Sequence, residues 1–153
     1  MTKILNEDEV TIANLNMHLK DSGLTPTVQN AERILLYTDH GVGFFITMVD
    51  RKRFARLGTW LPLNKAEPVS RKIDLERKLN REVFLPTFRL DADDDLDISY
   101  VLTYQHGLIA GQFISVVNRF ASMLDYVVAT YNHDGIICFH ERETERPNGV
   151  LLN

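Results

Sequence analysis

Cysteine is nearly absent from this chain of 153 residues, which contains only Cys138. One cysteine cannot form an intrachain disulfide, so the fold does not depend on oxidation. Long apolar runs are also missing, and no stretch approaches the roughly 20 apolar residues that a membrane-spanning helix needs. The first residues lack the apolar segment of a signal peptide and turn acidic at once. We therefore expect a cytoplasmic protein without a membrane segment.

The sequence also lacks the motifs of common enzyme classes. The segment Gly41–Gly43 has neither the third glycine nor the following helix of a phosphate-binding loop. No serine stands in a nucleophile elbow, and Cys138 has no basic neighbour in sequence that would activate its thiol. The histidines are scattered singly, and Cys138 with His140 would supply only two of the ligands that a zinc site requires. We expect no enzyme activity, no bound metal and no cofactor.

Apolar residues make up 44% of the chain and charged residues 25%, which is ordinary for a globular protein. A chain of this length can bury about 68–70% of its unfolded surface in one core. We expect a single α+β domain over residues 1–140. Residues 141–153 are charged and interrupted by proline and glycine, which predicts a mobile C-terminal tail.

The net charge of −4 is unevenly distributed along the chain. Between positions 51 and 81, ten basic residues stand against three acidic ones, a local balance of +7. Such a run is usually a solvated helix or turn, but it can also mark a surface that meets a charged partner. On the second interpretation, the candidate partner-binding residues are Arg51, Arg53, Arg56, Arg71, Lys72, Arg77, Lys78 and Arg81.

Cap and turn signals divide the first half of the chain into one helix and three strands. Asn6 with Glu9 matches a capping box, and Gly23 suits a left-handed C-terminal cap, which predicts a helix over 7–22. Clusters of apolar and aromatic residues predict strands over 27–38, 43–49 and 54–63. Their short connections favour an antiparallel meander over a parallel sheet.

The second half has the order helix, hairpin, helix. Pro68 suits the first turn of a second helix, whose predicted apolar stripe is Val69, Ile73, Leu75 and Leu79. Pro86 cannot donate to a ladder, so it belongs at a sheet edge, at a bulge or at the first residue of the strand predicted over 84–90. Apolar residues alternate with polar ones over 96–104. The last helix has apolar residues at helical spacing: Ile109, Phe113, Val116, Phe120, Leu124, Val127 and Tyr131. A short strand over 136–140 follows. The elements predict an antiparallel sheet with helices against one face, in the order α-β-β-β-α-β-β-α.

Aspartate dominates the turn of the predicted hairpin. Asp91, Asp93 and Asp95 match the first alternating ligands of a calcium-binding EF-hand loop. However, Leu96 stands where that loop needs glycine, and Leu102 stands where it needs a bidentate glutamate. Aspartate is also a common turn residue, so we expect a solvent-facing turn without a bound ion.

The segment from Trp60 to Val128 resembles the YbjN family of bacterial proteins. The matching features are Trp60-Leu61-Pro62-Leu63 at a strand end, Asn80 near a helix end, Phe88 and Leu90 before the aspartate-rich turn, and Gly107 with Gln112-Phe113 opening the last helix. The resemblance implies a fold like that of type III secretion chaperones, commonly as a dimer. It also implies a sensory-transduction regulator, associated with stress response, motility and surface polysaccharide, with no established catalytic residues. Ile109 departs from the polar cap usual in the family, so the last helix is expected to lack a side-chain cap.

Our leading hypothesis is a non-catalytic regulatory or chaperone-like adaptor that binds another protein and forms a homodimer. One alternative is a nucleic-acid-binding regulator that uses the basic 51–81 segment, where Phe54 lies among cations. The sequence pI of 5.7 argues against that alternative. A further alternative is a metal-dependent enzyme centred on the aspartate turn.

Overall fold

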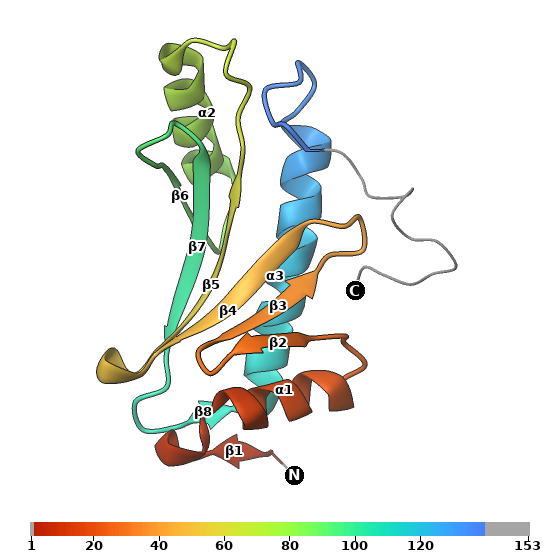
Figure 1. Ribbon diagram of the computed structural model, residues 1–153, viewed down its shortest axis with the longest axis vertical. Coiled ribbons are helices and arrows are strands. Elements are labelled where there is room, and N and C mark those ends of the chain that lie inside the picture. The colour runs from red at the N-terminus through yellow and green to blue at the C-terminus, as the bar shows by residue number, and fades with distance from the viewer. Residues whose placement is uncertain (1, 140–153) are drawn as a thin grey trace.

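The computed structural model describes residues 2–139 of the chain, and Figure 1 shows their arrangement. Within these residues the helices are α1 (Ile12–Asp21), α2 (Val69–Glu82) and α3 (Ala110–Thr130), with short 3-10 turns at η1 (Glu7–Glu9) and η2 (Asp50–Lys52). The strands of the main sheet are β2 (Thr27–Asn30), β3 (Arg33–Tyr37), β4 (Gly43–Val49), β5 (Phe54–Leu61), β6 (Thr87–Leu90) and β7 (Leu96–Thr103). They pair antiparallel in the order β2-β3-β4-β5-β7-β6. The predicted α+β class is confirmed.

The predicted strand over 27–38 is wrong in one respect, because the chain folds there into the hairpin of β2 and β3. The turn between them is stabilised by the Asn30 side chain, whose oxygen accepts a hydrogen bond from the Glu32 N–H at 2.8 Å. Asparagine favours turns through this short-range bond. The sheet therefore gains one strand beyond the predicted number, and β2 becomes its edge.

The first helix begins later than predicted. The Asn6 N–H does donate to the Glu9 carboxylate at 3.0 Å, but this bond closes η1 and not an α-helix. Thr11 has an extended backbone and caps α1, since its hydroxyl accepts a hydrogen bond from the Asn14 N–H at 3.2 Å. Gly23 has the predicted left-handed conformation, with φ of +86°.

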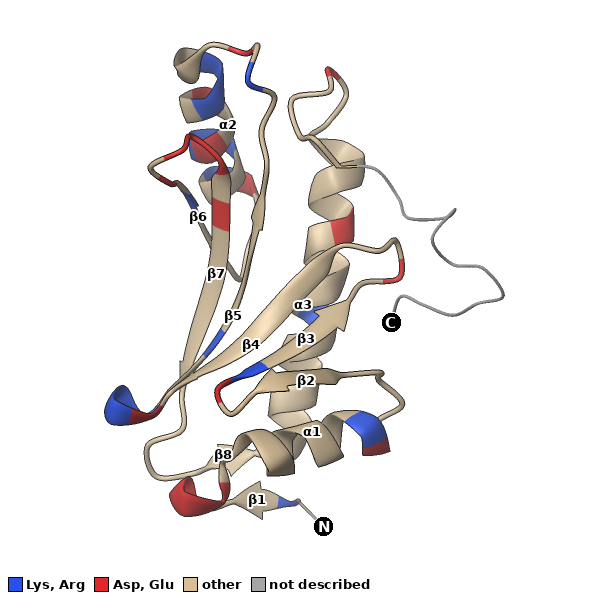
Figure 2. Cartoon of the chain, in the orientation of Figure 1, with Lys and Arg blue, Asp and Glu red and all other residues tan. Residues whose placement is uncertain are grey.

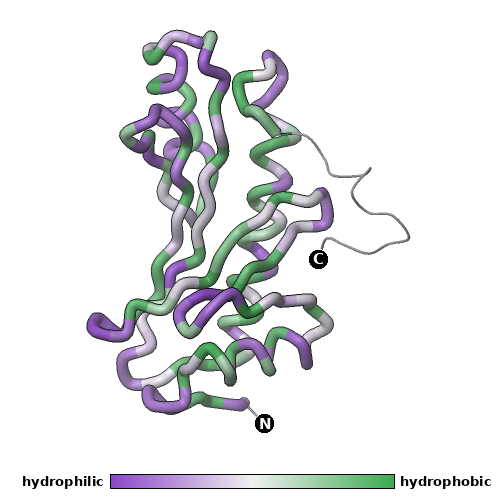
Figure 3. Tube along the Cα trace, viewed as in Figure 1, coloured by the Kyte–Doolittle hydropathy of each residue, from purple (hydrophilic) through white to green (hydrophobic). Residues whose placement is uncertain are grey.

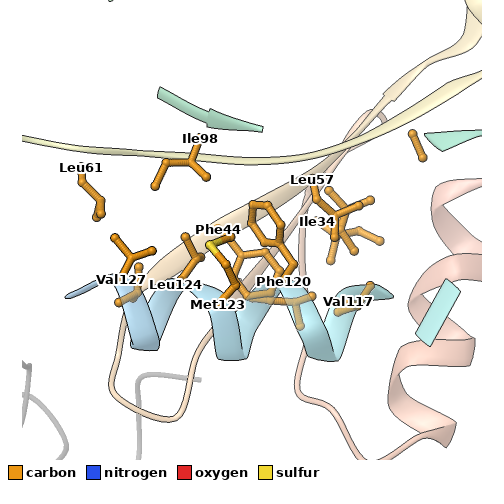
Figure 4. Close-up of a cluster of buried hydrophobic side chains, with 14 of the residues drawn as sticks. Ile34, Phe44, Leu57, Leu61, Ile98, Val117, Phe120, Met123, Leu124 and Val127 are labelled. Atoms are coloured by element: carbon orange, nitrogen blue, oxygen red, sulfur yellow. The ribbon is translucent and has the colours of Figure 1, made fainter. Parts of the chain in front are cut away.

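The core lies between one face of the sheet and the inner side of α3. Phe120 from α3 and Phe44 from β4 are both buried, and their ring centres lie 5.4 Å apart (Figure 4). The predicted inward residues of α3, Phe113, Phe120, Leu124 and Val127, are buried, whereas Val116 is only half-buried. Figure 3 shows the apolar character of α3 and the central strands, with hydrophilic residues gathered at turns. The alternation predicted along β7 is also confirmed, with Leu96 and Ile98 fully buried.

Helix α2 packs on the same side of the sheet, because Leu75 and Leu79 join the same buried core as the α3 residues. The prediction for Val69 is wrong: this first residue of α2 is 45% exposed. Lys72, one turn further along, is buried in its place. A lysine can cover apolar surface with its methylene stem in this way.

The start of α3 lacks a side-chain cap at Ile109, as expected from the sequence. The Ala110 N–H instead donates to the Lys3 carbonyl at 3.0 Å. This bond continues a small antiparallel pair that the sequence did not predict, formed by β1 (Ile4–Leu5) and β8 (Leu108–Ile109).

Two predicted strands are shorter than expected, and the predicted tail falls outside the described residues. The strand predicted over 84–90 begins only at Thr87, so Pro86 lies just before β6, which is an edge strand of the sheet. The predicted strand over 136–140 is reduced to a single bridge between Leu63 and Ile137. His140 and the predicted tail over 141–153 lie outside the described residues. Within residues 2–139, no helix is long and apolar enough to cross a membrane.

Candidate partner-binding surface

The face of the sheet opposite the core is a surface that the helices leave open. In Figure 1, β3 and β4 cross in front of α3, and α2 lies at the upper end of β6 and β7. Among residues 2–139, no helix crosses the front of these strands. We call this front the outer face. A sheet face without a covering layer is available to a partner.

The aromatic part of the outer face joins three neighbouring strands. Trp60 from β5 is 55% exposed and stacks on Phe45 from β4, with ring centres 6.4 Å apart and planes 12° apart. The guanidinium carbon of Arg33, from β3, lies 4.5 Å from the centre of the Phe45 ring. This distance is within the range of a cation–π interaction. Trp60 stays more than half exposed despite the stack, so part of its ring is available to solvent or a partner.

The charged part continues the same row onto β7 and β6. The two carboxylate oxygens of Asp97 bind different arginines, Arg56 at 3.1 Å and Arg89 at 3.2 Å. Asp97 is thereby shared between two guanidinium groups. We call Arg33, Phe45, Arg56, Trp60, Arg89 and Asp97 together the outer strip. Its three arginines and one aspartate give it a net positive charge.

Gly58 makes the Arg56–Asp97 contact possible. Arg56, Gly58 and Trp60 alternate along β5 and so share the outer face. A methyl group at Gly58 would lie only 3.0–3.3 Å from three guanidinium atoms of Arg56. The Arg56 side chain therefore passes over Gly58 to reach Asp97. It uses the space that the Cβ atom of any other residue at position 58 would occupy.

The structure does not bring the predicted basic residues together on one surface. Arg51 and Arg53 lie at η2, between β4 and β5, whereas the basic residues after Pro68 lie on α2. Figure 2 shows these two groups well apart along the molecule, because β5 runs between them. The basic segment 51–81 therefore does not form one continuous patch. Arg56 alone among the predicted residues belongs to the outer strip.

Most of the predicted α2 residues have partners within the chain. Arg71 binds Glu67 at 2.9 Å and also contacts Asp134. The Lys78 amine lies 5.6 Å from the centre of the Tyr131 ring, and Arg81 lies 3.5 Å from Glu82. Lys72 is only 4% exposed, so little of it is accessible to a partner. Arg77 is exposed.

Burial acts to raise the pKa of the Asp134 carboxyl, but opposing contacts prevail. The Ile136 N–H and the Arg71 guanidinium both stabilise the charged carboxylate. The resulting pKa lies below its usual value. Asp134 and Arg71 thus form a structural pair that ties α2 to the segment after α3.

Asp91 and Asp95, in the aspartate turn, accept hydrogen bonds from backbone N–H groups, which accounts for their presence there. Asp91 accepts hydrogen bonds from the N–H groups of Asp93 at 2.8 Å and Asp95 at 3.0 Å. Asp95 in turn accepts the Leu63 N–H at 2.9 Å. Asp94 has a left-handed backbone, with φ of +60°. Over the described residues, no group of three or more His, Cys, Asp or Glu side chains is placed to hold a metal ion.

Sequence reasoning missed most of the outer strip. The signal that was present is the alternation of Arg56, Gly58 and Trp60 in one strand, which places all three on one side. Phe45, Arg33 and Arg89 come from other strands and become neighbours only through the register of the sheet. Phe45 lies opposite Gly58, and Arg89 lies opposite Asp97.

Comparison with known proteins supports the fold. No protein-family model and no curated protein matches this sequence. Solved structures with a similar fold include YbjN, a proposed transcription regulator from E. coli, with a TM-score of 0.70 and 16% identity over 84% of this chain and 96% of that chain. A chain of the HopA1–SchA chaperone–effector complex matches with a TM-score of 0.53 and 12% identity, over 75% and 88% of the two chains. A chain of the ExsC–ExsE complex matches with a TM-score of 0.52 and 17% identity, over 82% and 92%. The chain therefore has a YbjN-like fold that is also similar to that of type III secretion chaperones.

Proposed function

We propose that this protein is a non-catalytic regulatory or chaperone-like adaptor that forms a homodimer and binds an acidic segment of another protein. The outer strip is the observation that carries the proposal. It exposes Trp60 beside three guanidinium groups on a sheet face that α2 and α3 leave open. Tryptophan and arginine are the residues most enriched at the energetic centres of protein interfaces.

The chemistry of the strip selects the kind of partner. An apolar or aromatic side chain of the partner would pack against the exposed part of the Trp60 ring, and an aromatic one would do so in an offset-stacked or edge-to-face arrangement. Carboxylates of the partner would accept hydrogen bonds from Arg33 and Arg89, which are both exposed. The similarity to chains from a chaperone–effector complex and from the ExsC–ExsE complex supports a protein as the partner.

The decisive experiment compares the wild-type protein with Arg33→Ala and Arg89→Ala variants as bait in cell extract, before and after nuclease treatment. Lys20→Ala, an exposed change on α1, is the matched control. We expect wild type and control to retain a partner after nuclease treatment and the outer-strip variants to lose it. Binding of the purified partner is then followed by tryptophan fluorescence, because Trp60 is the only tryptophan in the chain.

We expect each arginine variant to weaken binding by at least about tenfold, the effect of losing a charge-assisted hydrogen bond of about 1.5 kcal/mol. A partner held equally well by the outer-strip variants would contradict the assignment of this surface. A retained species that nuclease destroys, with affinity that falls steeply with salt, would support nucleic-acid binding instead.

A further inference from the structure

A second candidate surface lies on the opposite side of the molecule, among the helices. A groove of about 1070 Å³ runs between the end of α2 and the exposed side of α3. Its apolar lining comes from Val83, Leu85, Ile114 and Met123. The α3 wall presents small or polar residues at helical spacing, Gly111, Ser115, Asn118 and Ser122. Small side chains on a helix allow another chain to approach its backbone closely.

Phe84 stands at the rim of this groove and is 90% exposed, more than any other large hydrophobic residue that the structure describes. Its neighbours Val83 and Leu85 are buried and half-buried respectively. Leu85 adopts φ of +98°, a left-handed conformation that leucine rarely takes. Strained backbone of this kind persists only where surrounding structure enforces it and is concentrated at functional sites.

The surface formed by the groove and its rim is complementary to the same surface on a second copy of the chain. A protruding phenylalanine and an apolar groove lie on the same face of one chain. The two charged side chains of the lining are of opposite sign, Glu82 and Arg119. A two-fold axis brings the same patch of two subunits together, so each feature meets its complement. Phe84 of one copy would then meet the groove of the other, and Glu82, which within its own chain contacts Arg81 and Tyr131, would approach Arg119.

We propose that a second copy of this chain occupies the groove, with Phe84 of each subunit packed against α3 of the other. The inference rests on the proposed homodimer and locates its interface on the helical side of the molecule. The outer strip, on the other side of the sheet, then stays accessible in both subunits. The dimer would present two partner-binding surfaces facing away from its two-fold axis.

The test is the mass of the full-length protein in solution, measured by light scattering and sedimentation from low to high micromolar concentration. Phe84→Asp and Ser115→Arg alter the rim and the wall of the groove at exposed positions. We expect each to raise the dimer dissociation constant by about 30-fold or more, the usual effect of losing a central aromatic anchor or of blocking its pocket. Met17→Asp, an exposed apolar residue on α1, is the control and should remain dimeric.

The outcomes separate this inference from the proposed function. A wild-type protein that is monomeric at high micromolar concentration would overturn both the interface and the homodimer. A dimer that survives Phe84→Asp and Ser115→Arg but dissociates with Val101→Asp would overturn the groove interface and place the dimer contact on the outer face, while the homodimer itself would stand. Circular dichroism establishes that each variant is folded, and if Phe84→Asp is not, Phe84→Ser and Ser115→Arg decide the result. Partner binding by the monomeric variants, followed through Trp60, tests the outer strip independently.

Discussion

The side chain of Asn80 forms two hydrogen bonds with the backbone of Phe88. Its amide nitrogen donates to the Phe88 carbonyl at 2.8 Å, and its oxygen accepts the Phe88 N–H at 2.9 Å. Glu76, one turn earlier on α2, accepts the Leu90 N–H at 2.6 Å. Helix α2 therefore supplies the edge strand β6 with the bonds that a further strand would make. This closes one edge of the sheet to unwanted pairing, whereas β2 at the other edge is exposed along its whole length.

We predict that Asn80→Ala lowers the free energy of unfolding by about 2 kcal/mol, because it leaves a half-buried N–H and carbonyl without partners. Asn80→Asp keeps the acceptor for the Phe88 N–H but places a carboxylate oxygen against the Phe88 carbonyl, so it should also destabilise the protein at neutral pH. Urea unfolding measures both changes. Arg77→Ala, on the exposed side of the same helix, is the control. An Asn80→Ala protein as stable as this control would show that the edge does not depend on Asn80.

The elements that the sequence predicted well are those whose own pattern determines them. α3 has an apolar side sustained over 21 residues, and β7 alternates along its length. Over 27–38 the pattern predicts one strand where the chain forms two, because the turn between them depends on Asn30 and contains neither glycine nor proline. Helix α1 begins later than its pattern predicts because the capping-box pattern at Asn6 also fits a single 3-10 turn.

The candidate surface was less predictable than the fold. The basic residues between 51 and 81 are neighbours in sequence, but β5 separates η2 from α2 in space. The outer strip shows the reverse relation, since its members come from five strands. Phe45 and Trp60 stack only because β4 and β5 pair in this register. Such contacts follow from sheet assembly, which no local pattern specifies.

Phe120→Ala should lower the free energy of unfolding by about 3–5 kcal/mol, the usual cost of truncating a buried phenylalanine. Phe120 is fully buried and contacts the Phe44 ring, so the truncation leaves a cavity between α3 and the sheet. Chemical denaturation measures the change, with the unfolding free energies of wild type and variant compared at the same dependence on denaturant concentration. Asn118→Ala, exposed on the same helix, should change stability by less than about 0.5 kcal/mol. A loss below about 1 kcal/mol for Phe120→Ala would contradict the central position of this residue.

Gly58→Ala should separate Arg56 from Asp97 without unfolding the protein. The added methyl group meets only the flexible end of the Arg56 side chain, which can move away. The Arg56–Asp97 ion pair is partly exposed, and such pairs contribute about 0–1 kcal/mol. We therefore expect nearly unchanged stability but a shifted NMR signal of the Arg56 guanidinium and weaker partner binding. Ser99→Ala, directly opposite on β7, is the control. An unshifted Arg56 signal would mean that Gly58 does not shape the strip.

Tyr104 predicts how stability changes at high pH. Burial, and then its hydrogen bond to the Asp50 carboxylate at 3.0 Å, raise the pKa of this phenol above its ordinary value of 10.0. In the unfolded chain the phenol ionises near its ordinary pKa, whereas in the folded chain it stays protonated to higher pH. The stabilising contribution of Tyr104 is therefore fully present below pH 10.0 and is lost as pH rises toward the folded-state value.

Tyr104→Phe removes this ionisation, so the variant should lose less stability than wild type between about pH 9 and pH 11. At neutral pH the variant should be less stable, because Asp50 loses its hydrogen-bond donor. Wild type and Tyr104→Phe should both still lose some stability at alkaline pH through Tyr131, because burial and its hydrogen bond to Glu82 raise the pKa of that phenol as well. The Tyr104→Phe, Tyr131→Phe double variant should therefore have the flattest profile in urea unfolding across this range. Parallel profiles for wild type and both variants would show that neither phenol is held neutral by the fold.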